Sequence, residues 1–176
     1  REVFLFECYT GIRISDILTL KWKHITDEKI SIRMRKTEKL LSIPINDYVR
    51  AVSDRRRCAV ENNGGKITSE KYVFNILKVD VDEVSAQDAL NAISSATAVI
   101  NKQLKKIAKK TGIDKNLSTH CARHSYATAL LTNNIPLPVI KEMLGHSDIK
   151  VTQIYAKVVD SKRNEVVECL NKVYHG

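Results

Sequence analysis

Apolar residues recur at helical spacing at the start of the chain, with one interruption. Residues 2–9 indicate a helix with four apolar side chains that point mostly inward: Val3, Leu5, Phe6 and Tyr9. Thr10-Gly11 breaks the pattern, and residues 15–22 resume it. We therefore predict two helices separated by a tight break.

The pattern then changes to alternation of apolar and polar residues. It does so over residues 29–34 and again over residues 41–45, with the polar stretch 35–39 between them. This arrangement is typical of a β-hairpin. Residues 46–57 indicate a further helix, and Asn62-Asn63-Gly64-Gly65 is a strong loop signal.

The second half of the chain is helical in its pattern. A long helix over residues 95–110 has an apolar stripe made of Val99, Ile100, Leu104, Ile107 and Ala108. Shorter helices are predicted over 122–132, from Pro136 to Gly145, over 149–159 and over 161–173. Residues 78–86 show no clear periodicity. The fold class predicted is α+β, mainly α-helical, with a small antiparallel hairpin.

Composition narrows the choice of partner. With 176 residues the chain can form one domain with a substantial core, but not two full-sized domains. A net charge of +9 favours a polyanionic partner, most commonly nucleic acid. The four cysteines are widely and irregularly spaced, which argues against a zinc ribbon or disulfide scaffold and fits reduced thiols in the cytoplasm. No apolar run approaches the roughly 18 residues of a membrane span.

Several polar residues occupy positions suited to chemistry. Arg13 directly follows the break between the first two helices, and His120 and Arg123 share a helix face at spacing i, i+3. His146 follows the helix-ending Gly145, and Tyr155 comes nine residues later. Taken singly, each has an ordinary structural explanation; a tyrosine on an apolar stripe, such as Tyr155, is more often part of a core.

The predicted helix that carries His120 and Arg123 also has a spacing that could bind a metal ion. His120 and His124 have the i, i+4 spacing of zinc ligands. Zinc proteases of the H-E-x-x-H type need a glutamate after the first histidine, where this chain has Cys121. We therefore expect no metal site.

Together these segments resemble the catalytic domain of the tyrosine recombinase (phage integrase) family. The first arginine box of that family is similar to Thr10-Gly11-Ile12-Arg13-Ile14-Ser15-Asp16-Ile17-Leu18-Thr19-Leu20-Lys21-Trp22. Its H-x-x-R-H box is similar to residues 120–124, and its L-G-H…Y box to Leu144-Gly145-His146-Ser147 followed by Tyr155. Lys36-Thr37 matches the hairpin lysine of the family, although Lys39 lies close by. The similarity runs from near residue 1 to about residue 160.

The resemblance implies a catalytic set and a reaction. The catalytic set is Arg13, Lys36, His120, Arg123, His146 and Tyr155. Asp16 matches the acidic residue that supports the first arginine, and His124 matches a histidine of uncertain role. The implied activity is site-specific recombination of double-stranded DNA, without cofactor, metal or ATP, by a homotetramer on paired sites in the bacterial cytoplasm. Residues 1–176 would be the catalytic domain, with the DNA-clamping domain of the family outside this chain.

The chemistry of strand cleavage explains why these residue types are needed. Two arginines, Arg13 and Arg123, can hold the non-bridging phosphate oxygens by charge-assisted hydrogen bonds, and His146 can add a donor. A free tyrosine has a pKa of about 10, so Tyr155 needs a base, which His120 can supply. Lys36 can protonate the leaving 5′ oxygen. The predicted phosphate contacts are Arg55, Arg56, Arg57, Lys102, Lys105, Lys106 and Lys109.

Three other functions remain open at the level of sequence. A type IB topoisomerase would use the same chemistry to relax DNA. A domain that only binds DNA would need none of the catalytic residues, although competent residues fill all of those positions. A metal-dependent hydrolase would use His120, Cys121 and His124.

Overall fold

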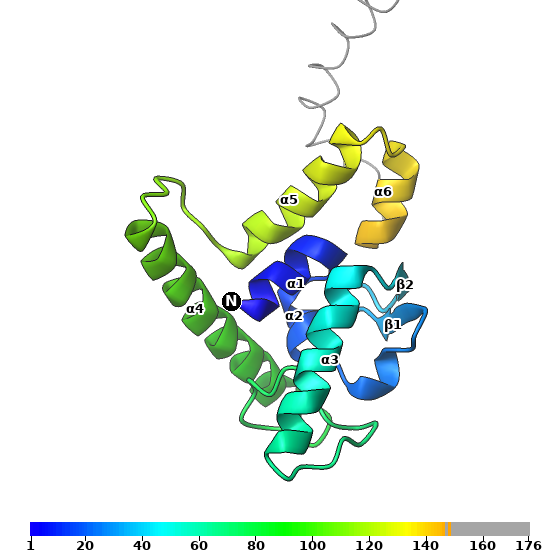
Figure 1. The fold of residues 1–176 in the computed structure, drawn as a ribbon, viewed down its shortest axis with the longest axis vertical. Helices are drawn as coiled ribbons and strands as arrows, with labels where there is room; N and C mark the ends of the chain where they lie inside the picture. The colour runs from blue at the N-terminus through cyan, green and yellow to red at the C-terminus, as the bar shows by residue number, and fades with distance from the viewer. Residues whose placement is uncertain (147, 149–176) are drawn as a thin grey trace, which may run out of the picture. The chain divides into compact units, whose positions relative to one another are not determined.

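The computed structural model describes residues 1–146 and 148. The elements are α1 (Glu2–Thr10), α2 (Ile14–Leu18), the 3-10 helix η1 (Trp22–His24), β1 (Lys29–Arg33), β2 (Leu40–Pro44), α3 (Asp47–Asn62), α4 (Ala86–Lys110), α5 (Thr119–Thr132) and α6 (Leu137–Leu144) (Figure 1). The chain divides into two compact units, residues 1–126 and 127–176, with the boundary inside α5. The predicted fold class, mainly helical with a two-stranded antiparallel sheet, is confirmed.

A left-handed glycine separates the first two helices, as predicted. Gly11 ends α1 with φ 66°, and its N–H donates to the Glu7 carbonyl oxygen at 2.8 Å. A side chain at this φ would cost about 1–2 kcal/mol, which explains the glycine. The turn places Arg13 at the N-cap of α2. The backbone of this turn therefore sets the direction in which Arg13 leaves the chain.

The second predicted helix is shorter than expected. We predicted residues 15–22, but α2 ends at Leu18. Beyond it the backbone pairs with a distant segment: Val73 N–H donates to the Leu20 carbonyl at 2.8 Å, and Trp22 N–H donates to the Lys71 carbonyl at 3.0 Å. These long-range hydrogen bonds replace the helical ones, and a local sequence pattern cannot predict them.

The predicted hairpin is confirmed. Ile30 faces Ile43 and Ile32 faces Leu41 across the two strands, and all four side chains are buried. Their alternation with exposed residues is the period-two pattern of a half-buried sheet. The turn between the strands carries Lys36, which is exposed.

Helix α3 packs against α1 and begins at a capped end. The Asn46 side chain accepts a hydrogen bond from Val49 N–H at 3.0 Å, which satisfies one of the unpaired amides of the first turn. Figure 1 shows α3 running beside α1. At this contact the ring of Tyr9, predicted to point inward, is 49% exposed and stacks on Tyr48 with ring centroids 4.2 Å apart.

Helix α4 begins nine residues before the predicted start. Ser85 caps it by accepting from Asp88 N–H at 3.1 Å. Its first half buries Ala89 and Ile93 in a cluster with Leu18 of α2. The short side chains of alanine give a weak hydrophobic pattern, which is why the sequence did not reveal this half.

The predicted stripe of α4 is only partly buried. Leu104 and Ala108 are buried, whereas Val99 is 60% exposed and Ile107 40% exposed. The apolar stripe seen in the sequence therefore does not coincide with a single buried face.

The second unit contains the end of α5 and all of α6. Pro136 is the N-cap of α6, and Gly145 ends it with φ 60° and an N–H donated to the Glu142 carbonyl at 2.8 Å. The predicted helix from Pro136 to Gly145 is confirmed. The helices predicted over 149–159 and 161–173 lie outside the described residues. Among the described helices, none is both long and apolar enough to cross a membrane.

Candidate active site around two arginines

Two of the predicted catalytic residues meet at the turn between α1 and α2. Arg123 lies on α5 and is 6% exposed. Its NH1 group donates to the carbonyl oxygen of Gly11, two residues before Arg13. The chain folds a guanidinium from a distant helix onto the turn that carries the other arginine. One short stretch of backbone thus holds both cations.

Arg13 also contacts the hairpin at the point where β1 enters the turn. Its NH1 group lies 3.1 Å from the Met34 sulfur, and Met34 directly follows β1. The peptide N–H of Arg35 donates to Asp16 Oδ1 at 2.9 Å. This hydrogen bond connects the hairpin turn to α2 at Arg35, the residue directly before Lys36.

Asp16 is a buried carboxyl between these charges. It is 3% exposed, and burial raises its pKa, while the Arg35 peptide N–H and the Arg13 and Arg123 guanidiniums lower it. Its Oδ2 has no hydrogen-bond partner among the described residues. The placement of Asp16 beside both arginines suits a supporting role.

Glu7 is a second buried carboxyl at the site, and the sequence prediction missed it. It is 2% exposed, and burial raises its pKa to about 8, although Arg123 and the Ile14 backbone N–H lower it. A signal was present in the sequence: Val3, Phe6, Glu7 and Thr10 occupy one buried helical face. An acidic residue inside such a face is rare unless it has a partner.

The two histidines of α5 lie against each other. The rings of His120 and His124 meet edge to face with centroids 4.3 Å apart. Burial lowers the pKa of His124, and His120 and Arg123 lower it further. His120 is exposed although Arg123, three residues later, is buried. The imidazole of His120 is therefore accessible to a substrate.

Two of the predicted catalytic residues, His146 and Tyr155, follow the first unit in the sequence. His146 belongs to the second unit, where it is half-buried and directly follows Gly145. Tyr155 lies outside the described residues. Across residues 1–146 and 148, no group of three or more His, Cys, Asp or Glu side chains is arranged to hold a metal ion.

The predicted phosphate contacts fall into two kinds. The arginines of α3 have partners within the protein: Arg55 and Arg56 pair with Glu2 at 3.4 and 2.8 Å, and Arg57 lies 4.8 Å from the Trp22 ring centroid. The lysines of α4 are exposed: Lys102, Lys105, Lys106 and Lys109. The lysines of α4 are thus the more accessible to a polyanion.

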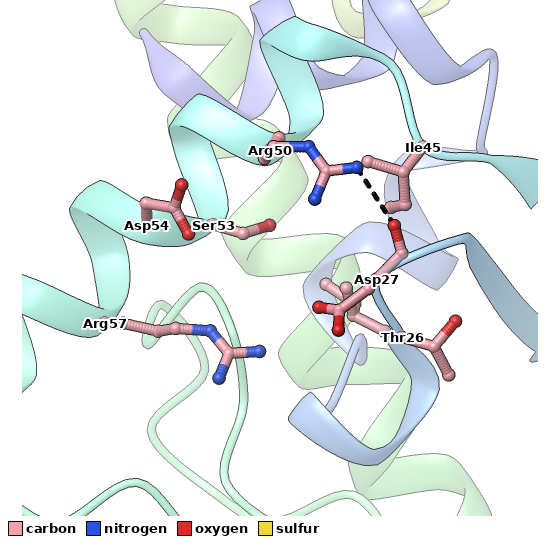
Figure 2. A pocket seen from close by; sticks show the side chains of 8 residues that line it. Thr26, Asp27, Ile45, Arg50, Ser53, Asp54 and Arg57 are labelled. Carbon is pink, nitrogen blue, oxygen red and sulfur yellow. Dashed lines mark hydrogen bonds between the residues drawn. The ribbon is translucent and has the colours of Figure 1, made fainter.

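A pocket of about 180 Å³ lies between α3 and the loop before β1 (Figure 2). Arg50 donates there to the Asp27 carbonyl at 3.1 Å, and the buried Ser53 hydroxyl has no hydrogen-bond partner among the described residues. Asp54 and Arg57 also line it. The pocket contains none of the predicted catalytic residues, so it is separate from the arginine site.

Comparison with known proteins assigns the family. The model of the Phage integrase family matches residues 1–162. The chain belongs to the phage integrase family. The match spans every box from which the resemblance was inferred, including the part of the sequence that contains Tyr155.

Individual relatives of this phage integrase chain are tyrosine recombinases. Tyrosine recombinase XerD of Staphylococcus aureus is 32% identical over 154 residues, which is 87% of this chain and 48% of the relative. Tyrosine recombinase XerA of Saccharolobus solfataricus is 30% identical over 163 residues, 92% of this chain and 47% of the relative. The chain therefore spans about half the length of these curated relatives.

A solved structure shares the fold. The crystal structure of the XerH site-specific recombinase, bound to palindromic difH substrate in a post-cleavage complex, has a TM-score of 0.67 and 21% identity. The similarity covers 97% of this chain and 45% of that one. At this level of identity the likeness shows the fold alone.

Proposed function

We propose that this chain is a catalytic domain that cuts and rejoins double-stranded DNA at specific sites through a covalent bond to Tyr155. The observation that carries the proposal is the attachment of Arg123 to the Gly11 carbonyl, beside Arg13. The names of the relatives and their shared family support the same activity. The basic charge of the chain and the exposed lysines of α4 support DNA as the substrate.

In this proposal the two arginines bind the scissile phosphate. Guanidinium groups form forked hydrogen bonds to phosphate oxygens, and donors fixed in advance stabilise charge that develops in the transition state. Burial of Arg123 and its attachment to the backbone fix its position before substrate arrives. Asp16 supports both arginines, and His146 would add a hydrogen bond to one oxygen.

Two proton transfers complete the cleavage step. His120 accepts the proton of the Tyr155 hydroxyl as its oxygen attacks phosphorus. The bond from phosphorus to the 5′ oxygen breaks, and Lys36 gives that oxygen a proton. The product is a 3′-phosphotyrosine and a free 5′ hydroxyl, which conserves the energy of the phosphodiester for rejoining. Because the arginines supply the positive charge, the proposed mechanism uses no metal, cofactor or ATP.

The proposed assembly is a homotetramer on two paired DNA sites in the bacterial cytoplasm. In it the lysines of α4 contact phosphates outside the cleavage site. The arginine run of α3 is the weaker candidate, because each of its three arginines already has a partner in the protein.

The decisive experiment traps the covalent intermediate. Full-length protein is incubated in EDTA with its element ends on a duplex that carries a nick beside the crossover site, and adducts are resolved on a denaturing gel. We expect an adduct that Tyr155→Phe abolishes. Tyr9→Phe is the matched control, because Tyr9 is 49% exposed and its ring stack with Tyr48 needs no hydroxyl.

The outcomes separate the alternatives. An adduct with recombinant product supports the proposal, whereas an adduct with only relaxed plasmid indicates a topoisomerase. DNA binding without an adduct indicates a domain that only binds DNA. Cleavage that needs a metal ion, or an adduct that persists in Tyr155→Phe, would overturn the mechanism.

A further inference from the structure

Glu7 is a buried acid beside a proposed catalytic residue, and the proposed reaction gives it no task. Its side chain projects from the buried face of α1, one turn before Gly11. The Ile14 backbone N–H donates to one side of its carboxyl group, whereas Oε2 has no hydrogen-bond partner among the described residues. The carboxyl group is therefore held in place but not fully paired.

Glu7 and Arg123 share the same piece of backbone. The Gly11 N–H donates to the Glu7 carbonyl, and the Gly11 carbonyl accepts from Arg123. The Arg123 guanidinium is also the largest favourable electrostatic influence on the Glu7 carboxylate. A change of charge on Glu7 therefore changes the electrostatic potential at the Arg123 guanidinium.

We propose that Glu7 is a positioning residue that controls how much positive charge Arg123 offers to a DNA phosphate, and that ionisation of Glu7 weakens the arginine clamp. The inference rests on the proposed function. When Glu7 is neutral, its carboxyl group does not compete with the phosphate for Arg123. When Glu7 is ionised, its negative charge competes with the phosphate for the same guanidinium in surroundings of low dielectric.

Several ionisable groups surround Glu7 and Arg123 and bear on the pH dependence of the clamp. On α1 the neighbouring group is the Cys8 thiol, whose pKa burial raises to about 11. On α5 they are Cys121 and Arg123, and Asp16 of α2 also interacts electrostatically with Arg123. The arginines of α3 that face α1 pair instead with Glu2. Within this group, burial raises the pKa of Glu7 to about 8.

The sign of the effect follows from the raised pKa. Below about pH 8 Glu7 is mainly neutral and the clamp is at full strength; above it Glu7 is ionised and the clamp weakens. The neutral fraction falls roughly tenfold between pH 7 and pH 9 for a group with a pKa of about 8. The rate of adduct formation should fall by up to this factor on account of Glu7.

The test compares single-turnover adduct formation by the full-length wild type and Glu7→Gln on the nicked duplex across this pH range. Glutamine keeps the shape of the side chain but cannot ionise. We expect the rate of Glu7→Gln divided by that of wild type to rise from pH 7 to pH 9 by up to about tenfold. Glu61→Gln, which replaces an exposed glutamate of α3, is the control and should follow the wild-type pH profile.

A direct titration keeps the inference testable if Glu7→Gln does not fold. The Glu7 carboxyl is followed by carbon-13 NMR in Tyr155→Phe protein, with and without the duplex. Because coupling is reciprocal, a phosphate that uses Arg123 must raise the pKa of Glu7. A rise on adding DNA supports the inference.

The results distinguish the inference from the function on which it rests. A rate ratio that stays constant with pH, or a Glu7 titration that DNA leaves unmoved, overturns the role of Glu7. If wild type forms no adduct at any pH, the proposed function fails, and the NMR titration alone then decides whether Glu7 responds to bound phosphate.

Discussion

Replacing Glu7 with glutamine should change how the stability of the protein depends on pH. In the unfolded chain Glu7 has its ordinary pKa of about 4.5, whereas burial raises it to about 8 in the folded protein. Between these values the folded state holds a proton that the unfolded state has released. The free energy of unfolding therefore falls as pH rises from about 4.5 to 8, and this loss is complete above 8.

The size of this loss follows from the shift. Each unit of pKa corresponds to about 1.4 kcal/mol, so Glu7 should cost the folded state about 4 kcal/mol between pH 5 and pH 9. Glutamine does not titrate, so Glu7→Gln should become more stable relative to wild type by this amount over the same range. Asp16 also has a raised pKa, but it is present in both proteins and its titration cancels in the comparison.

Urea unfolding provides the measurement. Trp22 is the single tryptophan of the chain and is buried, so its fluorescence reports loss of the core around it. Glu61→Gln is the matched control and should follow wild type at both pH values. Free energies of unfolding that keep a constant difference between wild type and Glu7→Gln from pH 5 to pH 9 would refute the claim that Glu7 is buried in its neutral form.

Three other substitutions test single features. Gly11→Ala should lower the free energy of unfolding by about 1–2 kcal/mol in urea, because φ is 66° there; an unchanged midpoint would contradict that geometry. Asn46→Ala should cost about 1 kcal/mol in the same assay through loss of the cap of α3, with Asn46→Ser largely retaining it. Lys36→Ala should slow adduct formation by about 10² or more without moving the unfolding midpoint, whereas Lys39→Ala should have little effect; the reverse order would reassign the proposed acid.

Features set by local sequence could be predicted. The hairpin alternates residues such as Ile30 and Ile32 with polar ones, and Gly11 and Gly145 mark turns that only a left-handed residue makes easily. The boxes around Arg13 and Arg123 were visible because each is a short, contiguous motif. Local backbone conformation and the order of the motifs could therefore be predicted from the sequence.

Features set by contacts between distant segments could not be predicted. The end of α2 depends on hydrogen bonds from residues 20–22 to residues 71–73, and no local pattern specifies that pairing. The position of Arg123 depends on a peptide carbonyl, a group that every residue possesses and that no sequence distinguishes. Glu7 was visible as an acid in an apolar face, but its neighbours became known only from the packing of α5.

The acceptor that holds Arg123 is a main-chain oxygen, which gives this anchor an unusual tolerance to mutation. No side-chain replacement at position 11 deletes that oxygen; a replacement can only displace it by changing the conformation of the backbone. Residues that enter the left-handed region at moderate cost, asparagine foremost, should therefore retain the anchor where bulky or branched residues lose it. A substitution at this position would therefore act on Arg123 through the path of the polypeptide and not through the chemistry of a side chain.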